Sequence, residues 1–213
     1  MPKLLALFSG TGNVGKAFSA KNWEVVYLDL DPACNATHCC DILLWVCLYP
    51  PGYFDVIWAS PDCRFYSLAR STAKTPRDLQ LADSLVLRTI SLIFYLRPRY
   101  WFIENPQTGL LKTRAFMHGL PYKDVSYCSY GMPYRKLTRI WTNFSKWQPR
   151  PLCIKDQCPF VRDGRHIATA QGGPGKVRGV RMSNDNFERR ELYGIPAELC
   201  AEIVDCLTEN LVV

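Results

Sequence analysis

Short apolar runs alternate with polar, glycine-bearing connections along the first half of the chain. Runs at residues 3–8, 24–28, 55–59 and 100–103 each have the length of a buried strand. Between the last two runs, apolar residues recur at helical spacing, namely Leu79, Ala82, Leu85, Val86, Thr89, Ile90 and Ile93. Strands that alternate with helices over short connections predict an α/β fold with a mostly parallel sheet and right-handed crossovers.

The polar residues around the long helical pattern predict its two ends. Thr75 is a suitable N-cap, Pro76 suits the first helical position, and the carboxylate of Asp78 favours the positive end of the helix dipole. Pro98 cannot continue a helix, so the helix should end just before it. We therefore expect a helix from the region of Thr75 to Pro98.

The pattern becomes irregular between residues 147 and 181. Glycines and prolines there leave little room for regular elements. We interpret this segment as a short insertion on the sheet domain, followed by a terminal helix from Ala197 to about Leu207. The predicted organisation is a core at 1–146, an insertion at 147–182, and the C-terminal part of the core at 183–213.

Composition adds limits to this picture. A chain of 213 residues with 48% hydrophobic and 13% aromatic residues can bury one sizeable core. Its formal net charge of +7 permits a polyanionic partner without requiring one. Many of the ten cysteines lie in apolar runs, so we expect reduced, buried side chains rather than a disulfide framework; these are Cys34, Cys39, Cys40, Cys47, Cys128, Cys200 and Cys206.

The termini and apolar segments predict an intracellular protein. Met1-Pro2-Lys3 runs directly into a strand-like segment, as expected without a signal peptide. The most apolar stretch, residues 84–96, contains Arg88 and is too short for a membrane span. We expect no membrane contact, and no obligate protein partner is evident.

A glycine-rich turn after the first strand predicts an adenosine cofactor. Gly10, Gly12 and Gly15 have the spacing that lets the backbone approach a ligand, and Asp29 and Asp31 close the second strand with carboxylates that can bind ribose hydroxyls. The same pattern serves dinucleotides and S-adenosylmethionine. A plain glycine turn with a surface aspartate is the alternative.

Two further strand ends carry reactive side chains. Cys63 lies beside Arg64 and Arg70, whose charges could lower the thiol pKa and produce a nucleophile; a structural cysteine is the alternative. Glu104 follows the apolar residues 100–103. Apolar surroundings raise the pKa of a carboxyl and favour its protonated form, so Glu104 could be a general acid. The alternative for Glu104 is a cap of the next helix.

The insertion has a basic character and a weak metal signal. Its basic residues among glycines predict contacts to nucleic-acid phosphates, with a solvated basic loop as the alternative; they are Arg162, Arg165, Lys176, Arg178 and Arg181. Cys153, Cys158 and His166 have loosely zinc-like spacing but no obvious fourth ligand. We therefore expect no metal and keep these three residues as weak candidates for zinc.

Seven segments occur in one order along nearly the whole chain: 8–12, 29–31, 41–42, 63–67, 104–106, 130–136 and 187–191. In this order they resemble the successive motifs of the DNA cytosine-5 methyltransferase family. The likeness is strongest to the short versions carried by large DNA viruses and phages, which share phrases like residues 58–61 and 140–143. The resemblance implies a Rossmann-like S-adenosylmethionine-dependent methyltransferase fold.

The resemblance also implies roles for individual residues. S-adenosyl-L-methionine would be held by Phe8, Ser9, Gly10, Thr11, Gly12, Asp29, Leu30, Asp41, Ile42 and Ser60. Cys63 would be the nucleophile and Glu104 the proton donor, with Arg135 and Lys136 where family arginines contact the target base. Arg64, Ser67 and Arg70 would join the basic residues of the insertion in binding double-stranded DNA.

The implied function is methyl transfer to C5 of cytosine in double-stranded DNA through a covalent Cys63 adduct. Asp62 replaces the usual proline before the nucleophile, and its charge would raise the thiol pKa. One alternative is an RNA cytosine-5 methyltransferase, which would share all these motifs. The other, supported by Asp62, is a catalytically weak or dead DNA-binding relative. An amino-group methyltransferase would leave Glu104 idle, and an NAD oxidoreductase has no use for the pair of Cys63 and Glu104. A viral member would act wherever the viral DNA is, in host nucleus or cytoplasm.

Overall fold

The computed structural model describes residues 1–68, 75–170, 176–177, 180–181 and 194–211. The strands of the main sheet are β1 (Lys3–Leu7), β2 (Glu24–Asp29), β3 (His38–Cys39), β4 (Val56–Ala59), β5 (Tyr100–Pro106), β6 (Tyr122–Ser126) and β7 (Leu137–Thr142). The α-helices are α1 (Asn13–Ser19), α2 (Leu79–Leu96) and α3 (Ala197–Leu211). Short 3₁₀ helices are η1 (Pro32–Cys34), η3 (Leu110–Thr113), η4 (Ala115–Met117), η5 (Tyr127–Tyr130) and η6 (Lys155–Gln157).

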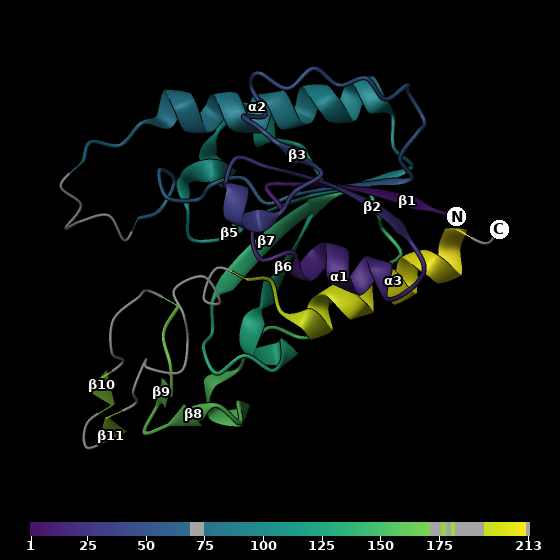
Figure 1. The fold of residues 1–213 in the computed structure, drawn as a ribbon. Coiled ribbons are helices and arrows are strands. Elements are labelled where there is room, and N and C mark those ends of the chain that lie inside the picture. The colour runs from purple at the N-terminus through teal and green to yellow at the C-terminus, as the bar shows by residue number, and fades with distance from the viewer. Residues whose placement is uncertain (69–74, 171–175, 178–179, 182–193, 212–213) are drawn as a thin grey trace.

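The main sheet has seven strands in the order β3-β2-β1-β4-β5-β7-β6. Strands β1 to β5 pair in parallel, and β7 runs antiparallel between β5 and β6. Helix α2 covers one face of the sheet and α1 with α3 covers the other (Figure 1). The predicted α/β class with a mostly parallel sheet is confirmed.

The chain leaves β1 toward β2 on one side and later returns to β4 on the other side. This switch point opens a crevice at the carboxyl ends of β1 and β4, where ligands of open α/β sheets bind. The loop after β1, the end of β2, the loop after β4 and the end of β5 all lie at this edge because these strands are parallel. The topology therefore gathers the predicted cofactor and catalytic segments at one place.

Helix α2 begins later than its sequence pattern predicts. Its N-cap is Asp78, whose carboxylate accepts a hydrogen bond from the backbone N–H of Leu81 at 2.8 Å, so the prediction of Thr75 as cap is wrong. A carboxylate that reaches a free N–H of the first turn is a strong start signal. At the other end, Arg97 in the left-handed conformation caps the helix before Pro98, as predicted.

The two antiparallel strands β6 and β7 and the length of β5 were not predicted. Strands β6 and β7 form an antiparallel hairpin-like edge on β5. Strand β5 continues to Pro106, so Glu104 pairs within the sheet opposite Ile140 and does not cap a helix. The terminal helix α3 also extends past its predicted end at Leu207, to Leu211.

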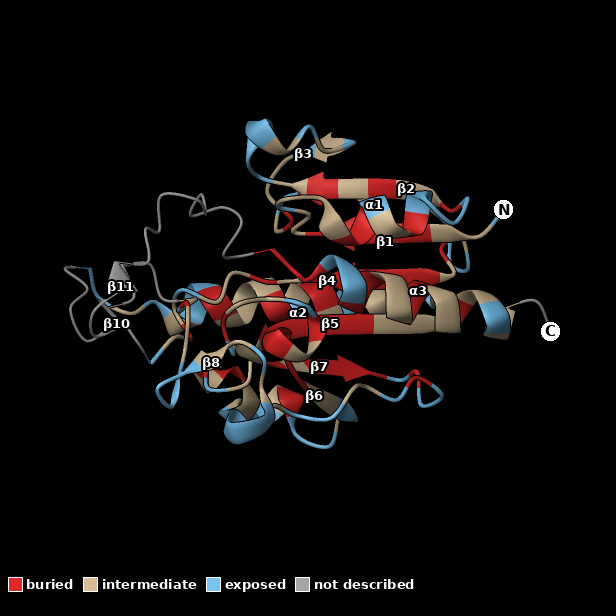
Figure 2. Ribbon diagram, turned by 90° about the horizontal axis from the view of Figure 1, so that it is seen from below, coloured by how far each residue is buried: buried red, intermediate tan, exposed pale blue. Residues whose placement is uncertain are grey.

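The core occupies both faces of the sheet, and Figure 2 shows the central strands as the most buried elements. Under α1 and α3, Trp58 stacks on Phe102 with ring centroids 5.1 Å apart. Cys128 and Cys200 are buried there, but the other cysteines expected in the core are only half-buried, and Cys39 is exposed. They lie in loops, in strand β3 or on the sides of helices, so the prediction of burial is wrong for them.

Helix α2 is long and apolar enough to cross a membrane, by length and composition alone. In the structure its buried face packs on the sheet through Ala82, Val86 and Leu92. The guanidinium of Arg88 donates to the backbone carbonyls of Ile42 and Trp45 at 3.2 and 2.7 Å. These contacts are those of a core helix, and the absence of membrane contact stays a prediction.

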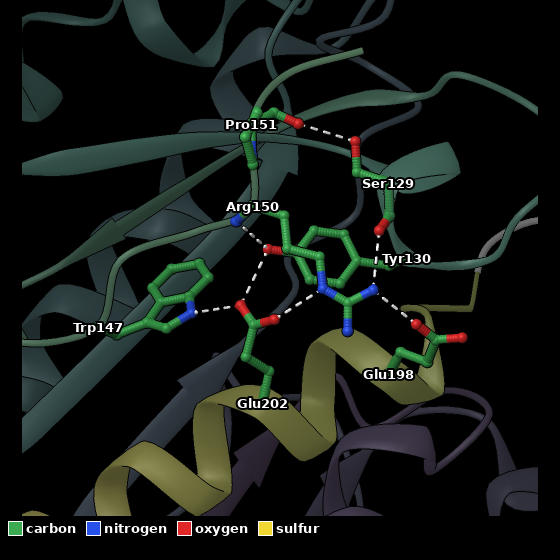
Figure 3. Close-up of polar contacts among 7 residues, drawn as sticks. All are labelled: Ser129, Tyr130, Trp147, Arg150, Pro151, Glu198 and Glu202. Atoms are coloured by element: carbon green, nitrogen blue, oxygen red, sulfur yellow. Dashed lines mark hydrogen bonds and ion pairs between the residues drawn. The ribbon is translucent and has the colours of Figure 1, made fainter. Parts of the chain in front are cut away.

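A polar cluster fastens the start of the predicted insertion to α3 (Figure 3). We call it the Arg150 cluster; it consists of Ser129, Tyr130, Trp147, Arg150, Pro151, Glu198 and Glu202. Arg150 donates to Glu202 at 2.8 Å and to Glu198 at 2.7 Å. The indole N–H of Trp147 donates to Glu202 at 3.0 Å, and its ring is buried in the core. The division of the chain at residue 147 stays a prediction.

Candidate active site

The loop after β1 is shaped by two glycines. Gly12 has a φ of 72°, a left-handed conformation that glycine adopts without strain, and it caps the start of α1. A Cβ on Gly15 would lie 2.3 Å from the ring of Tyr27, so only glycine lets α1 approach β2 this closely. Helix and strand therefore meet directly beside the loop, as in nucleotide-binding folds.

Asp29 holds this loop in place from the end of β2. One carboxylate oxygen accepts from the backbone N–H of Gly10 at 2.8 Å, and the other from that of Asp31 at 2.9 Å. Each carboxylate oxygen can accept a second hydrogen bond, so Asp29 can still bind a ribose hydroxyl. The predicted ribose acid thus also organises the glycine loop.

Two adjoining cavities follow the carboxyl edge of the sheet. The first, of about 500 Å³, is lined by the predicted cofactor residues Phe8, Ser9, Gly10, Thr11, Asp29 and Ser60. The second, of about 470 Å³, shares Phe8, Asp29 and Ser60 and adds Leu30, Asp41 and Ile42. Both volumes lie in the usual range for small-molecule sites. The structure brings these nine residues together, with Gly12 behind them at the start of α1.

The cavity wall suits an adenosine ligand. The hydroxyl of Ser9 is buried in the first cavity and has no hydrogen-bond partner within the described part of the chain. Buried polar groups are normally paired, so a ligand atom at this position would satisfy the hydroxyl. Carboxylates at Asp29 and Asp31 and apolar walls at Phe8 and Ile42 complete a site for a ribose and a base.

Cys63 lies in the wall of the first cavity, at the start of the loop after β4. Its carbonyl accepts backbone N–H groups of Tyr66 at 3.1 Å and Ser67 at 2.9 Å, which close a tight turn. Burial raises the pKa of Cys63 to about 11, with further contributions from Glu104 and Asp62 and an opposing one from Lys136. The expectation of a lowered pKa is wrong, while the upward effect of Asp62 is confirmed.

Among the described residues, no arginine contributes to the Cys63 pKa, and the neighbouring Arg64 is paired with Asp62. Arg64 donates through Nε to Asp62 at 2.7 Å, and its Nη2 lies 2.6 Å from the same carboxylate. Its charge is therefore balanced within the loop. Arg70 lies outside the described residues. Arg64 also lines the cavity, and Ser67 closes the turn that begins at Cys63.

Glu104 faces the same cavity from β5 and is 6% exposed. One of its oxygens accepts the hydroxyl hydrogen of Tyr127 at 3.1 Å. The charge of Glu104 adds to burial in raising the pKa of Cys200 to about 12, which places this α3 thiol near the carboxyl. A carboxyl surrounded by Tyr127 and Cys200 is held in one orientation in a largely apolar wall.

Asn105 connects the two catalytic segments. Its side-chain amide donates to the carbonyl of Pro61 at 2.9 Å in a buried position. This hydrogen bond fixes the loop that carries Cys63 relative to the strand that carries Glu104. Asn105 and Glu104 both belong to β5. This strand and the hydrogen bond to Pro61 therefore set the separation of the Cys63 thiol and the Glu104 carboxyl.

The two basic residues predicted for the site separate in the structure. Lys136 lines the cavity with Cys63 and Glu104, and its ammonium lies 4.7 Å from the ring centre of Tyr127. Arg135 is exposed. The pKa of His166, in the predicted insertion, is lowered by the burial of its ring and by the charge of Arg135. Of these two residues, Lys136 is the one that lines the cavity, which Arg64 also borders.

Sequence reasoning missed the residues that support the Cys63 loop. Arg77 donates to the carbonyls of Phe65 at 2.7 Å and Ser67 at 3.0 Å. Asp83 of α2 accepts the hydroxyl hydrogen of Tyr66 at 2.8 Å and pairs with Arg114. The available signal was Asp83, a carboxylate next to the buried Ala82 in an apolar helix.

The predicted DNA-contact residues are placed only in part. Strands β8 (Val161–Arg162) and β9 (Arg165–His166) form a hairpin in which Arg162 and Arg165 pair and are both exposed. Strands β10 (Lys176–Val177) and β11 (Val180–Arg181) form a second hairpin that contains the predicted Lys176 and Arg181. Arg178 lies outside the described residues.

Comparisons with known proteins give a consistent class. No protein-family model matches the chain. It is 33% identical over 224 residues to a Frog virus 3 (isolate Goorha) protein named "Probable DNA (cytosine-5)-methyltransferase", covering 95% of this chain and 99% of that protein. In fold it is similar to the Entamoeba histolytica methyltransferase EhMeth, with a TM-score of 0.56, 12% identity and 99% of each chain covered.

A second solved structure is a protein encoded within an E. coli prophage and described as a DNA modification methyltransferase. The TM-score is 0.54 with 16% identity, and the match covers 76% of this chain but 56% of that one. The viral relative, together with the fold and the two cavities, identifies an S-adenosyl-L-methionine-dependent methyltransferase. By its likeness to the viral relative over the length of both proteins, the chain belongs to the DNA (cytosine-5)-methyltransferase family. The resemblance seen in the motifs is confirmed.

Proposed function

We propose that this protein transfers a methyl group to C5 of cytosine in double-stranded DNA, with Cys63 as the nucleophile. The observation that carries the proposal is that Cys63, Glu104 and Lys136 line one cavity together with the glycine loop and Asp29. The name of the viral relative supports DNA as substrate. S-adenosyl-L-methionine supplies an electrophilic methyl group when it is bound.

Cys63 is proposed to make C5 of the base reactive. C5 of cytosine is a poor nucleophile, and addition of a thiolate to C6 makes C5 electron-rich. In this step the Cys63 sulfur forms a bond to C6 while a proton reaches N3 of the ring. After C5 has been methylated, C5 loses its proton to solvent, N3 returns its proton to the group that donated it, and the bond between sulfur and C6 breaks to release the Cys63 thiolate.

Glu104 is proposed to supply the proton to N3, and Lys136 to favour the thiolate. Glu104 is buried in the cavity wall and is oriented by Tyr127 at 3.1 Å, so its carboxyl can face the base edge without exchange with bulk water. Lys136 lowers the pKa of Cys63 against burial and the charge of Glu104. The neutral thiol thus ionises when the base and the cation are both in place.

The target cytosine must leave the duplex to reach this cavity, because its reactive atoms are enclosed in the base stack. The exposed pair of Arg162 and Arg165 supports a role of the insertion in holding the phosphate backbone meanwhile. We propose an intracellular site of action, wherever viral DNA is located.

A covalent trap tests the proposal. A DNA duplex containing 5-fluorocytosine cannot lose its C5 substituent as a proton, so the Cys63 adduct accumulates and survives denaturing electrophoresis. We expect an adduct with wild type and with Cys206→Ser, and none with Cys63→Ser. Normal methylation of DNA by Cys63→Ser would refute the nucleophile. An adduct on fluorinated RNA alone would show that the substrate is RNA.

A catalytically weak DNA-binding relative is the second candidate. It is favoured by Asp62 at the position of the usual proline and by the pKa of about 11 at Cys63, which leaves little thiolate near neutral pH. Such a protein would bind the fluorinated duplex without forming the adduct. Bisulfite sequencing of DNA from cells expressing the protein would then show no new methylcytosine.

A further inference from the structure

Four potential metal ligands meet beside the catalytic core. Cys128 belongs to η5 in the core, Cys153 and Cys158 lie on either side of η6, and His166 ends β9. One ligand atom from each of the four lies within 4.8 Å of the others. Twenty-four residues separate Cys128 from Cys153, so this group arises only when the insertion folds against the core.

Two of the distances in this group match the edges of a zinc tetrahedron. Zinc binds thiolate sulfur at about 2.3 Å and imidazole nitrogen at about 2.0–2.1 Å, so sulfur and nitrogen on one tetrahedral ion lie about 3.5 Å apart. The Nε2 atom of His166 lies 3.5 Å from Cys153 Sγ and 3.4 Å from Cys158 Sγ. Two measured edges therefore have the required length.

The backbone holds the ligand loops in this arrangement. The β8–β9 turn consists of Asp163 and Gly164 with φ values of 49° and 70°, the left-handed pair of a two-residue hairpin. The N–H of Val161 donates to the carbonyl of Cys158 at 3.0 Å, and that of Cys153 donates to Ser126 Oγ at 3.1 Å. Cys153, Cys158 and His166 are thus each positioned by backbone contacts that do not involve their ligand atoms.

The surrounding insertion has little apolar material to hold it. Leu152 and Ile154 are about half exposed or more, at 47% and 58%, and residues 155–157 and 162–165 are exposed. Small segments with so little buried surface are commonly stabilised by a metal or disulfides. All three cysteines are free thiols in the structure.

We infer that Cys128, Cys153, Cys158 and His166 bind a structural zinc ion that fastens the insertion to the core. Three thiolates and one imidazole in a tetrahedron are a ligand set typical of structural zinc. Four protein ligands leave no open position for substrate, so the ion acts on structure. Cys128 follows Tyr127, which orients Glu104, so the ion links the insertion to the wall of the active site. Cys128 is the fourth ligand that the sequence did not reveal. The binding of an ion there is this inference, which replaces the expectation of no metal.

Metal analysis of the full-length protein, purified under reducing conditions without added metal, tests the inference. We expect about one zinc ion per chain, and replacement by Co²⁺ should give the visible absorption of a tetrahedral cobalt–thiolate centre. His166→Gln should lose the metal. His166→Cys should retain it, because it restores a fourth zinc ligand.

Two control variants separate loss of the ion from general damage. Cys206→Ser and His118→Gln remove a cysteine and an exposed histidine outside the group, and they should keep the zinc. On wild type, a chelator should speed tryptic cleavage after Arg162 and Arg165 without changing the far-ultraviolet spectrum of the core. This readout does not depend on whether any variant folds.

Several results would overturn the inference. One is wild-type protein that contains no zinc, takes up none when Zn²⁺ is added, and gives no tetrahedral cobalt spectrum. Another is iron in place of zinc, or a Cys153–Cys158 disulfide in protein kept under reducing conditions. Equal zinc content in His166→Gln and wild type would also exclude this ligand set. None of these measurements involves methyl transfer, so their outcome is independent of the proposed function.

Discussion

At the scale of single residues, the chemistry of the site depends on how Cys63 is surrounded. Burial, Glu104 and Asp62 all favour the neutral thiol, and Lys136 alone among the stated contributions from side chains favours the thiolate. Arg64 cannot help because it is paired with Asp62. The cavity without a ligand therefore favours the neutral and less nucleophilic form of Cys63.

This balance predicts the pH dependence of Cys63 alkylation. Because the pKa is raised to about 11, the thiolate fraction and the rate with iodoacetamide should rise about tenfold per pH unit from pH 7 and level off only near pH 11. Glu104→Gln removes a raising charge, so alkylation should become faster while methyl transfer becomes slower. Mass spectrometry of the peptide containing Cys63 measures the rate.

The matched variant is Lys136→Gln, which removes the charge that lowers the pKa and should slow alkylation. A rate for Cys63 that already levels off near pH 8 or 9 would contradict the raised pKa. Slower alkylation in Glu104→Gln would show that the charge of Glu104 does not act on the thiol.

At the scale of elements, the cofactor cavity depends on the close approach of α1 to β2. The contact passes through Gly15 and the ring of Tyr27, which also lines the first cavity. The loop between them is held by Asp29 through the N–H of Gly10. A change in the packing of this helix on its strand therefore reaches the ligand site directly.

Gly15→Ala should weaken cofactor binding more than it weakens folding. The new Cβ would lie 2.3 Å from Tyr27, so the ring must move, and it borders the cavity. Overpacking of this kind costs about 1–3 kcal/mol. We expect reduced affinity for S-adenosylhomocysteine by calorimetry, and partial recovery when Tyr27→Ala is added, because the two changes are coupled.

Ser19→Ala, on an exposed position of the same helix, should leave affinity unchanged. If Gly15→Ala binds S-adenosylhomocysteine as wild type does, the close approach has no influence on the cavity. If the effects of Gly15→Ala and Tyr27→Ala on affinity are simply additive, the loss of affinity does not come from the contact between these two residues.

At the scale of the whole molecule, the C-terminal helix holds distant parts of the chain together. Helix α3 packs beside α1, contributes Cys200 near Glu104, and carries Glu198 and Glu202 of the Arg150 cluster (Figure 3). Helix α3 thus supports both the active site and the start of the insertion, and its removal would disturb both regions.

Glu202→Ala should destabilise the protein through the Arg150 cluster. Glu202 accepts hydrogen bonds from Trp147, Tyr130 and Arg150, and the first two donors are buried. Donors left without an acceptor cost about 1–3 kcal/mol. Urea denaturation should show this loss, while Glu209→Ala, at an exposed position of α3, should change stability little. Equal stability of both variants would mean that water replaces the carboxylate.

The exposed hairpin predicts a salt-dependent contribution to DNA binding. Removing Arg162 and Arg165 together should reduce the slope of log affinity against log salt by about one to two, since each phosphate contact contributes about 0.9. Affinity should fall alike for all sequences, measured by fluorescence anisotropy. The double variant of Arg97 and Arg99, exposed at the other edge of the sheet, removes the same charge and should keep the slope. An unchanged slope in the hairpin variant would exclude phosphate contact there.

The sequence by itself determined the α/β class, the cofactor segments and the family. These properties depend on local order: apolar runs at strand length, a glycine turn after the first strand, and reactive residues that follow strand ends. Parallel strands place their carboxyl ends at one edge, so local positions along the chain predict a common site. Gly10 and Asp29 were found in this way, and the resemblance to the family added the other seven residues around the two cavities.

Only the tertiary structure decided which charges and ligands meet. The antiparallel edge formed by β6 and β7 places Lys136 in the cavity and Arg135 outside it, and brings Tyr127 to Glu104. The same edge carries Cys128 to Cys153 and His166, far along the chain. The periodicity of a sequence reports which face a residue presents, but the partner on that face depends on packing between distant segments. The raised pKa of Cys63 and the fourth zinc ligand are both results of that packing.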